Sequence, residues 1–497
     1  MYLHGRSLRL RKAGRLANSR RIILLLVLIL GGLLVVSLRQ QGLVQPLFIP
    51  TLAPTRIPQV YADEAEAQFA AGNLKAAVAA YRGAVQADPK NLNYWVAMAR
   101  VQIFAQQYDE ALASAGNALM VSPNDAKARA IYAWALDWNV AYGCRCKTLA
   151  EAESAAVTAI ALDSNYAPAH AYYSEILNDA GKWNQGFTEA ETALRLAPNL
   201  LEAERALGYA NESVGNYEGA IEHYKAALKI NPNLISVYLA LGLNYRVLLD
   251  YEQAIFYFSK ANAIDPQNID PYLYLSRTYY QNDELGTAIQ YLQQALNIEP
   301  DNPDIHGRLG LILFKRRNYE GAEPELRLAV LGGKVDGLGN PLLDSAGVPL
   351  NDASGNAVAS LDANGNPVVL DANGQPVTGE DGKVLDVQPL PLSGSITLEY
   401  YYTYGNLLAF LKQCKPNQAP RILQLALNYR PDDPTVKGSY DESMAICAGT
   451  LTADEAINGT ATPVGASTPV IASAPISTAT PADQPASSGA ADITPTP

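Results

Sequence analysis

The chain has 497 residues, which is longer than a single hydrophobic core usually supports. Apolar residues make up 48% of it and charged residues only 17%, and with four cysteines and four histidines it is neither a disulfide-stapled mini-protein nor a dedicated multi-metal protein. Residues 1–40 hold eight Lys and Arg and no acid, which leaves 29 bases against 49 acids, or −20, in the rest. This acidic body argues against nucleic acid as a partner.

The N-terminal part of the chain contains one segment suited to a membrane. Residues 22–38 read IILLLVLILGGLLVVSL without a charge, enough for about 25 Å of helix. Seven of the eight bases precede this segment, so the positive-inside rule places residues 1–21 in the cytoplasm and the rest of the chain outside it. A cleaved signal peptide is the alternative, but the following SLRQQGLVQP lacks a small-residue cleavage site, which favours an uncleaved anchor.

Two further segments have the composition of linkers. Residues 39–60 carry prolines at 46, 50, 54 and 58, which predicts a semi-rigid extended spacer beyond the membrane. Residues 450–497 are rich in Ala, Thr, Pro and Ser and lack Lys and Arg, so we expect a disordered tail. Asn458 fits a short N-glycosylation pattern, although such a short match is often chance.

A 34-residue period organises the middle of the chain. Prolines at 89, 123, 198, 232, 266 and 300 mark it, and Ser164 takes the missing position after a seven-residue insertion. Five positions before each marker stands Ala84, Ala118, Ala159, Ala193, Ala227, Ala261 or Ala295. Twelve positions before stands Ala77, Ala111, Ala152, Gly186, Ala220, Ala254 or Ala288. A large residue often stands eight positions before, as Tyr81, Tyr224, Phe258 and Leu292 do.

This period, with proline after the second helix of each unit, resembles the tetratricopeptide repeat family over residues 61–330. The resemblance implies an all-α fold in which helix pairs stack into a right-handed superhelix, with small residues where helices cross. We expect about eight repeats in 61–330 and a final repeat with a capping helix in 395–449. Gly72, Gly181 and Gly215 are expected at turns within the pairs. The segment 22–38 makes the chain a membrane-anchored, bacterial member in this interpretation.

Residues 331–394 interrupt the array with a different pattern. Aspartates at 336, 344, 352, 362 and 371 each stand three residues before a glycine, which suits type I turns. Short apolar pieces lie between these turns, so we expect a small, β-rich insertion of hairpins. Calcium binding is the disfavoured alternative, because the spaced acids and terminal Glu of an EF-hand loop are missing.

The sequence offers little catalytic chemistry. It contains no phosphate-binding glycine loop, no HExxH, no Gly-x-Ser-x-Gly and no CxxC, so we expect no enzyme activity, no cofactor and no metal. His170 and His306 take the fourth position of a first helix, where Trp95 stands in another repeat, and this predicts a packing role.

The four cysteines predict disulfide chemistry on the extracytoplasmic side. Cys414 and Cys447 are 33 residues apart, one short of the repeat, and we expect them on successive helices within reach of a disulfide. A bridge between Cys144 and Cys146 is less favoured. A four-thiolate zinc site would need both pairs together, and about six repeats separate them.

The resemblance also implies that the first helix of each pair lines a concave groove. The residues expected to face it are Trp134, Trp138, Tyr172, Glu175, Arg205, Tyr209, Glu212, Arg246, Tyr274, Arg277, Tyr280 and Arg308. Aromatic and arginine side chains commonly anchor interfaces, and about half of these rings are expected to pack between helices instead. We therefore expect a scaffold for a protein or peptide. The alternative is a module for cell-envelope glycans, based on an exposed Trp134 and Trp138 pair.

Overall fold

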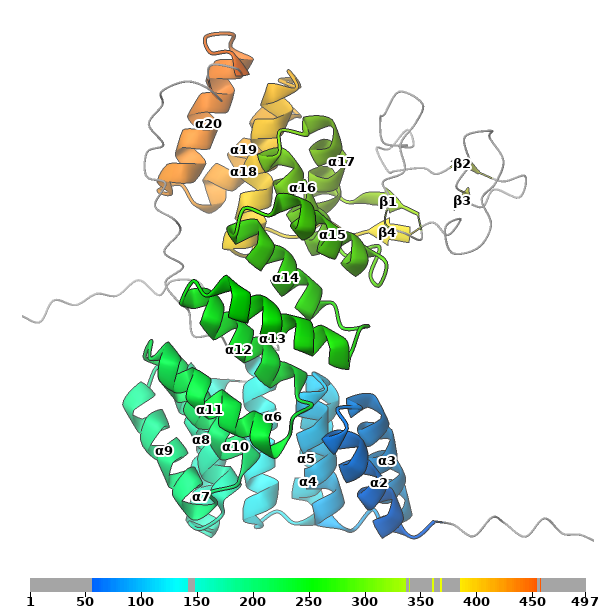
Figure 1. Cartoon of the computed structure of the whole chain (residues 1–497), viewed down its shortest axis with the longest axis vertical. Coiled ribbons are helices and arrows are strands. Elements are labelled where there is room, and N and C mark those ends of the chain that lie inside the picture. The colour runs from blue at the N-terminus through cyan, green and yellow to red at the C-terminus, as the bar shows by residue number, and fades with distance from the viewer. Residues whose placement is uncertain are drawn as a thin grey trace, which may run out of the picture. The chain divides into compact units, whose positions relative to one another are not determined.

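The structure, a computed structural model, describes residues 56–141, 148–336, 339, 360–361, 367–368, 385–453 and 456. Within these ranges it contains nineteen helices and two small antiparallel strand pairs (Figure 1). The predicted anchor at 22–38, its basic flank, Cys144, Cys146 and nearly all of the tail lie outside the described residues. In the part of the chain that is described, no helix combines the length and apolar character needed to cross a membrane.

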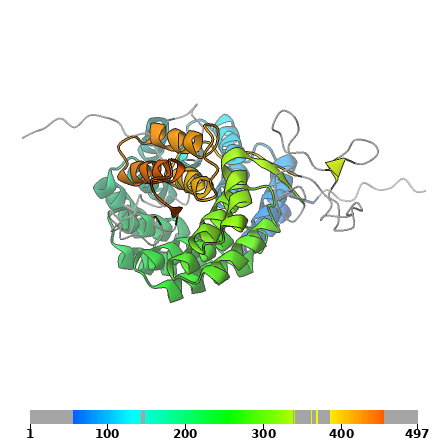
Figure 2. The same ribbon diagram turned by 90° about the horizontal axis from the view of Figure 1, so that it is seen from above.

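Eight helix pairs follow one another and form the first part of the array. They are α2 (Pro58–Ala70) and α3 (Leu74–Ala87), α4 (Leu92–Phe104) and α5 (Tyr108–Val121), α6 (Ala126–Ala141) and α7 (Leu149–Leu162), α8 (Ala167–Asp179) and α9 (Trp183–Leu196), α10 (Leu201–Ser213) and α11 (Tyr217–Ile230), α12 (Ile235–Val247) and α13 (Tyr251–Ile264), α14 (Asp270–Gln281) and α15 (Leu285–Leu296), and α16 (Pro303–Lys315) and α17 (Tyr319–Leu331). Each pair packs within itself and against the next, and the pairs follow a curved path (Figure 2).

A ninth pair and a last helix follow the insertion. They are α18 (Ser395–Phe410) with α19 (Ala419–Tyr429), and α20 (Pro434–Cys447). The mostly helical repeat fold expected from the 34-residue period is therefore confirmed, and the predicted turn glycines adopt positive φ, as at Gly72 with φ 81°.

Small residues at the helix crossings explain why the pairs pack so closely. The fourteen residues at the two small positions are all buried, and every alanine among them is fully covered. On the facing helix, Gly208 lies against the ring of Tyr224, and Gly242 lies against Phe258. A Cβ atom at Gly242 would stand 2.4 Å from Cε1 of Phe258, so the ring occupies the space that any side chain there would need.

We expect Gly242→Ala to lower the melting temperature, because overpacking against the buried Phe258 ring costs about 1–3 kcal/mol. This cost exceeds or offsets the gain of up to about 1 kcal/mol from better helix propensity. Gly116, inside α5, is the matched control, because nothing lies within 4 Å of a Cβ atom built there. Gly116→Ala should therefore raise the melting temperature. Equal shifts in the two variants, measured by circular dichroism, would contradict this packing account.

A recurring hydrogen bond joins six of the first helices to the end of the preceding repeat. A side chain in the first turn of the helix contacts the carbonyl oxygen six residues earlier, in the pairs Trp95–Pro89, Arg129–Pro123, His170–Ser164, Tyr238–Pro232, Tyr272–Pro266 and His306–Pro300, at 2.9–3.1 Å. The other ring nitrogen of His170 meets Glu189, and that of His306 meets Glu325, each at 2.6 Å. Both histidines therefore have structural partners, in agreement with the packing role expected for them.

The first two repeats also touch later repeats far along the chain. The side-chain amide of Asn233, between α11 and α12, donates to the carbonyl oxygen of Ala70 at 2.8 Å. Arg100 of α4 forms an ion pair with the buried Glu202 of α10. These contacts join the first two repeats to later ones, and no local sequence pattern could predict contacts between residues more than 100 positions apart.

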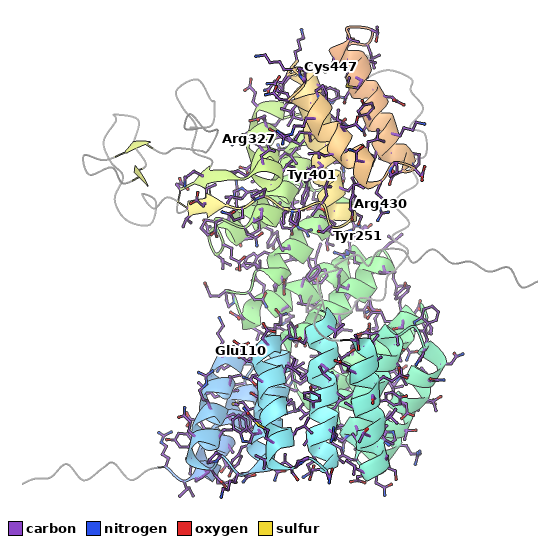
Figure 3. The ribbon with its side chains drawn as sticks, turned by 180° about the vertical axis from the view of Figure 1, so that it is seen from behind. Glu110, Tyr251, Arg327, Tyr401, Arg430 and Cys447 are labelled. Atoms are coloured by element: carbon purple, nitrogen blue, oxygen red, sulfur yellow. A yellow bond between two sulfur atoms is a disulfide. The ribbon has the colours of Figure 1, made fainter. Side chains whose placement is uncertain are left out.

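The insertion leaves the array and returns to it through paired strands. β1 (Gly333–Val335) pairs with β4 (Leu385–Val387), and β2 (Ser360–Leu361) pairs with β3 (Pro367–Val368), both antiparallel. The remainder of the insertion lies outside the described residues. Tyr401 of α18, labelled in Figure 3, donates to the carbonyl oxygen of Leu390 at 3.0 Å just after β4. Because β1 and β4 bring the two ends together, α18 packs directly on α17 and the repeat stack continues.

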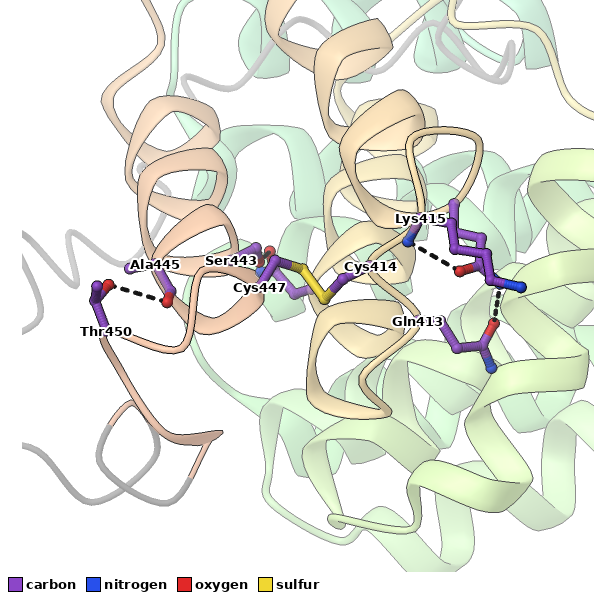
Figure 4. Close-up of a disulfide and its surroundings, with 9 residues drawn as sticks. Gln413, Cys414, Lys415, Ser443, Ala445, Cys447 and Thr450 are labelled. Atoms are coloured by element: carbon purple, nitrogen blue, oxygen red, sulfur yellow. Dashed lines mark hydrogen bonds between the residues drawn. A yellow bond between two sulfur atoms is a disulfide. The ribbon is translucent and has the colours of Figure 1, made fainter.

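A disulfide joins Cys414 and Cys447, with their Cα atoms 5.4 Å apart (Figure 4). Cys447 ends α20, but Cys414 lies in the loop between α18 and α19, not on a helix as the repeat spacing suggested. The hydroxyl of Ser443 contacts the side-chain amide of Asn406 on α18 at 2.8 Å. The disulfide therefore fixes the C-terminal end of α20 to the last repeat.

Candidate ligand-binding site on the inner face

The first helices of the pairs, which we call the inner face, carry all twelve residues selected from the sequence, on α6 to α16. Six of these are buried, namely Trp134, Tyr172, Glu175, Arg205, Tyr209 and Glu212. Six are half-buried, namely Trp138, Arg246, Tyr274, Arg277, Tyr280 and Arg308. Apart from Trp138 on α6, the two groups separate along the chain, because all selected residues beyond α10 keep some exposure.

The buried group lies on α6, α8 and α10, and most of its side chains pair with one another or with neighbouring helices. Arg205 donates to both carboxylate oxygens of Glu175, and the indole nitrogen of Trp134 donates to the same carboxylate at 2.7 Å. The rings of Trp134 and Tyr172 stack with centroids 4.3 Å apart. Trp134 has no exposed surface, so it is not the exposed ring that the glycan alternative assumed. These side chains bind one another, and a ligand role for them stays a prediction.

Three arginines on successive first helices define a second region, which we call the arginine site. Arg246 lies on α12, Arg277 on α14 and Arg308 on α16. The Arg308 guanidinium donates to Asp304 at 2.7 Å. Among the described residues, the guanidinium groups of Arg246 and Arg277 form no hydrogen bond or ion pair, and Nη1 of Arg246 is buried without an acceptor.

The pKa values of the arginine site reflect repulsion between its guanidinium groups. Burial, followed by the nearby Arg277 charge, lowers the pKa of Arg246 to about 9. Burial and then the Arg308 charge lower the pKa of Arg277. The acids near this group are Asp270 and Asp304, which act on Arg308, and Glu399, which acts on Arg277 and Arg308. Because no carboxylate among the described residues pairs with the Arg246 or Arg277 guanidinium, a bound anion would stabilise these two charges.

Family models described as "TPR repeat" match residues 213–246 and 277–316, and models described as "Tetratricopeptide repeat" match residues 68–137 and 235–268. These matches lie within the helical array, and the match at 235–268 covers the pair α12 and α13. The chain contains tetratricopeptide repeats. Such repeats are scaffolds for protein–protein interaction and are typically non-catalytic. No curated protein sequence matches this tetratricopeptide repeat protein significantly.

Two solved structures resemble this tetratricopeptide repeat protein at low identity. One is the Cut9–Hcn1 hetero-tetramer of the APC/C, with 16% identity, a TM-score of 0.45, and coverage of 56% of this chain and 53% of that chain. The chain thus spans about half the length of that relative. The other is a tetratricopeptide repeat protein from Parabacteroides merdae, with 14% identity, a TM-score of 0.34, and coverage of 52% and 98% respectively.

Sequence reasoning missed the partners that surround the arginine site. Glu399 and Tyr400 lie on α18, beyond the insertion, where the 34-residue phase is lost. The hydroxyl of Tyr400 donates to Asp304 at 2.6 Å, next to Arg308, and the Tyr274 ring lies 5.7 Å from the Arg246 guanidinium carbon. The ninth repeat of this tetratricopeptide repeat protein therefore completes the surroundings of the three arginines, and only the structure reveals it.

Proposed function

We propose that this protein is a scaffold that binds a protein ligand at the arginine site and that the ligand places an acidic group there. The observation that carries the proposal is the pair of half-buried guanidiniums, Arg246 and Arg277, which form no ion pair or hydrogen bond among the described residues. An unpaired charge held away from water is costly, so a site with this arrangement gains most from binding an anion. The half-buried rings of Tyr274 and Tyr280 add apolar area beside the arginines.

The experiment is capture of a binding partner by the immobilised full chain from an extract of its own cells. The double variant Arg246→Gln and Arg277→Gln should capture at least tenfold less partner, because charge-assisted hydrogen bonds at an interface centre carry much of the binding energy. Arg82 and Arg421 are exposed, so the variant Arg82→Gln and Arg421→Gln is the matched control for net charge. It should capture as much partner as the wild-type chain.

Two outcomes would contradict the proposal. Undiminished capture by the double variant, with its helical circular dichroism intact, would exclude the arginine site as the anchor. Capture that survives the double variant but disappears when residues 331–394 are deleted would make the β-rich insertion the recognition element. The glycan alternative predicts instead that immobilised envelope glycans compete for capture, although the burial of Trp134 removes one of its supports.

We also propose that residues 22–38 anchor the chain in a membrane with the repeats on the extracytoplasmic side. The uncharged segment and the seven bases before it support this orientation. Protease added to intact spheroplasts should then degrade the repeats, as it does after lysis. Full protection in intact spheroplasts, with degradation only after lysis, would reverse the orientation.

A further inference from the structure

A small cavity lies between α6, α8, α10, α11 and α12, apart from the arginine site. Its volume is about 20 Å³, which is room for one group the size of a water molecule. It is lined by Asp137, Trp138, Ala141, Glu175, Asp179, Arg205, Tyr209, Tyr224, Ser236, Val237 and Ala240. Trp138, Ala141 and Ser236 are half-buried, so this side of the lining reaches the surface.

The polar lining is acidic and its single cation is already paired. Three carboxylates line the cavity, and Arg205 is the one basic residue among its lining residues. Both oxygens of Glu175 accept from Arg205, and Asp179 accepts from the hydroxyl of Tyr209. Asp137 is only 3% exposed, and its Oδ1 atom has no hydrogen-bond partner among the described residues. The cavity thus holds a buried carboxylate oxygen that is open to a donor.

The raised pKa values of the cavity carboxylates indicate that the cavity lacks a positive charge to balance them. Burial is the largest cause that raises the pKa of Asp179, to about 7, and it raises the pKa of Asp137 well above its usual range. Asp179 and Glu175 raise the pKa of Asp137 further, and Arg205 lowers it. The hydrogen bond from Tyr209 lowers the pKa of Asp179, Glu175 raises it, and Arg205 lowers it. Of the other elements around the cavity, α10 supplies Tyr209, α11 supplies Tyr224, and the lining residues of α12 are uncharged. A cation placed here would stabilise the ionised carboxylates.

We propose that this cavity binds a primary ammonium group, the charged end of a lysine side chain or of a small alkylamine. An ammonium group is about the size of water and donates up to three hydrogen bonds, so it fits both the volume and the free Oδ1 atom of Asp137. A planar guanidinium group is larger than the cavity. The aromatic rings in the lining favour a cation over a neutral donor.

Titration calorimetry on the full chain tests the proposal with two probes, Nα-acetyl-lysine amide and methylammonium. We expect an ammonium probe to bind at least tenfold more weakly to Asp137→Asn than to the wild-type chain. Binding to the wild-type chain should be tighter at pH 8 than at pH 6, because Asp179 is increasingly protonated at pH 6. Asp179→Asn, which can still accept from Tyr209, should weaken binding as well. Asp301→Asn removes an exposed charge without a described contact and should bind like the wild-type chain.

The two probes distinguish the source of the ammonium group. Binding of the lysine probe alone indicates a lysine side chain, and binding of methylammonium as well indicates a free amine; either supports the proposal. Absence of binding by both probes at ~10 mM, or equal affinity in Asp137→Asn and the wild-type chain, would overturn it. Equal competition by potassium chloride and by Nα-acetyl-arginine amide would also overturn it, because the site would then lack selectivity for ammonium.

Discussion

The variant Arg205→Met should lower the free energy of unfolding by about 3–5 kcal/mol at pH 8, because it leaves the carboxylate of Glu175 buried without its cation. Arg205 donates to both oxygens of Glu175 and also lowers the pKa values of Asp137 and Asp179. Methionine keeps most of the side-chain volume, so the loss reports charge more than packing. The exposed Arg82→Met is the matched control and should change stability by less than about 0.5 kcal/mol.

The loss of unfolding free energy in Arg205→Met should become smaller as the pH falls. The pKa of Glu175 is raised mainly by burial and is held down by Arg205, so it rises further when Arg205 is absent. The folded state then binds more protons than the unfolded state below this pKa, and lowering the pH stabilises it. Urea unfolding at pH 8 and pH 5 measures both effects. Two results would contradict the account of this buried cluster. One is a loss of unfolding free energy that is as large at pH 5 as at pH 8, and the other is a loss below ~1 kcal/mol at pH 8.

Removing the disulfide by Cys414→Ser and Cys447→Ser should destabilise the packing of α20 by about 2–4 kcal/mol. The disulfide closes a loop of 33 residues, and α20 contributes few fully buried side chains of its own, such as Val436. Terminal repeats of a solenoid have one neighbour instead of two, so they fray first. The loss should therefore appear as local opening and not as global unfolding.

Limited trypsin digestion measures this opening at Lys437, which lies inside α20. Cleavage there should be roughly 30-fold faster or more in the variant, which corresponds to about 2 kcal/mol. Lys225, on α11, serves as the internal control and should be cleaved at an unchanged rate. Equal cleavage at Lys437 with and without the disulfide would show that helix packing alone holds α20 in place.

The helix pairs could be predicted from the sequence because their contacts repeat every 34 residues. Ala77 and Ala84 mark the same crossing as Ala220 and Ala227, and all four are fully buried. Each repeat contacts its neighbours, so a local pattern determines most of the packing. The insertion at 331–394 could also be predicted, because its sequence pattern departs from the 34-residue period. The pairing of β1 with β4 could be seen only in the structure.

The inner face could be predicted only in part, because it depends on contacts between distant repeats. Arg205 and Arg246 both belong to first helices and have the same residue type, yet Arg205 is paired and buried whereas Arg246 is half-buried without an acceptor among the described residues. The difference arises because Glu175 faces Arg205 one repeat away, whereas no carboxylate in the described part of the chain pairs with Arg246. Sequence spacing identified the face that both residues share, but not the local charge balance.

Hydrogen exchange on the full chain, with and without the captured partner, tests the central claim most directly. We expect the partner to slow exchange in α12, α14, α16 and α18, the helices that carry Arg246, Arg277, Arg308 and Glu399. Exchange in α6, α8 and α10 should stay unchanged, because their inner side chains already bind one another. Slower exchange confined to α6, α8 and α10, or to the strands β1 and β4, would contradict the assignment of the ligand to the arginine site.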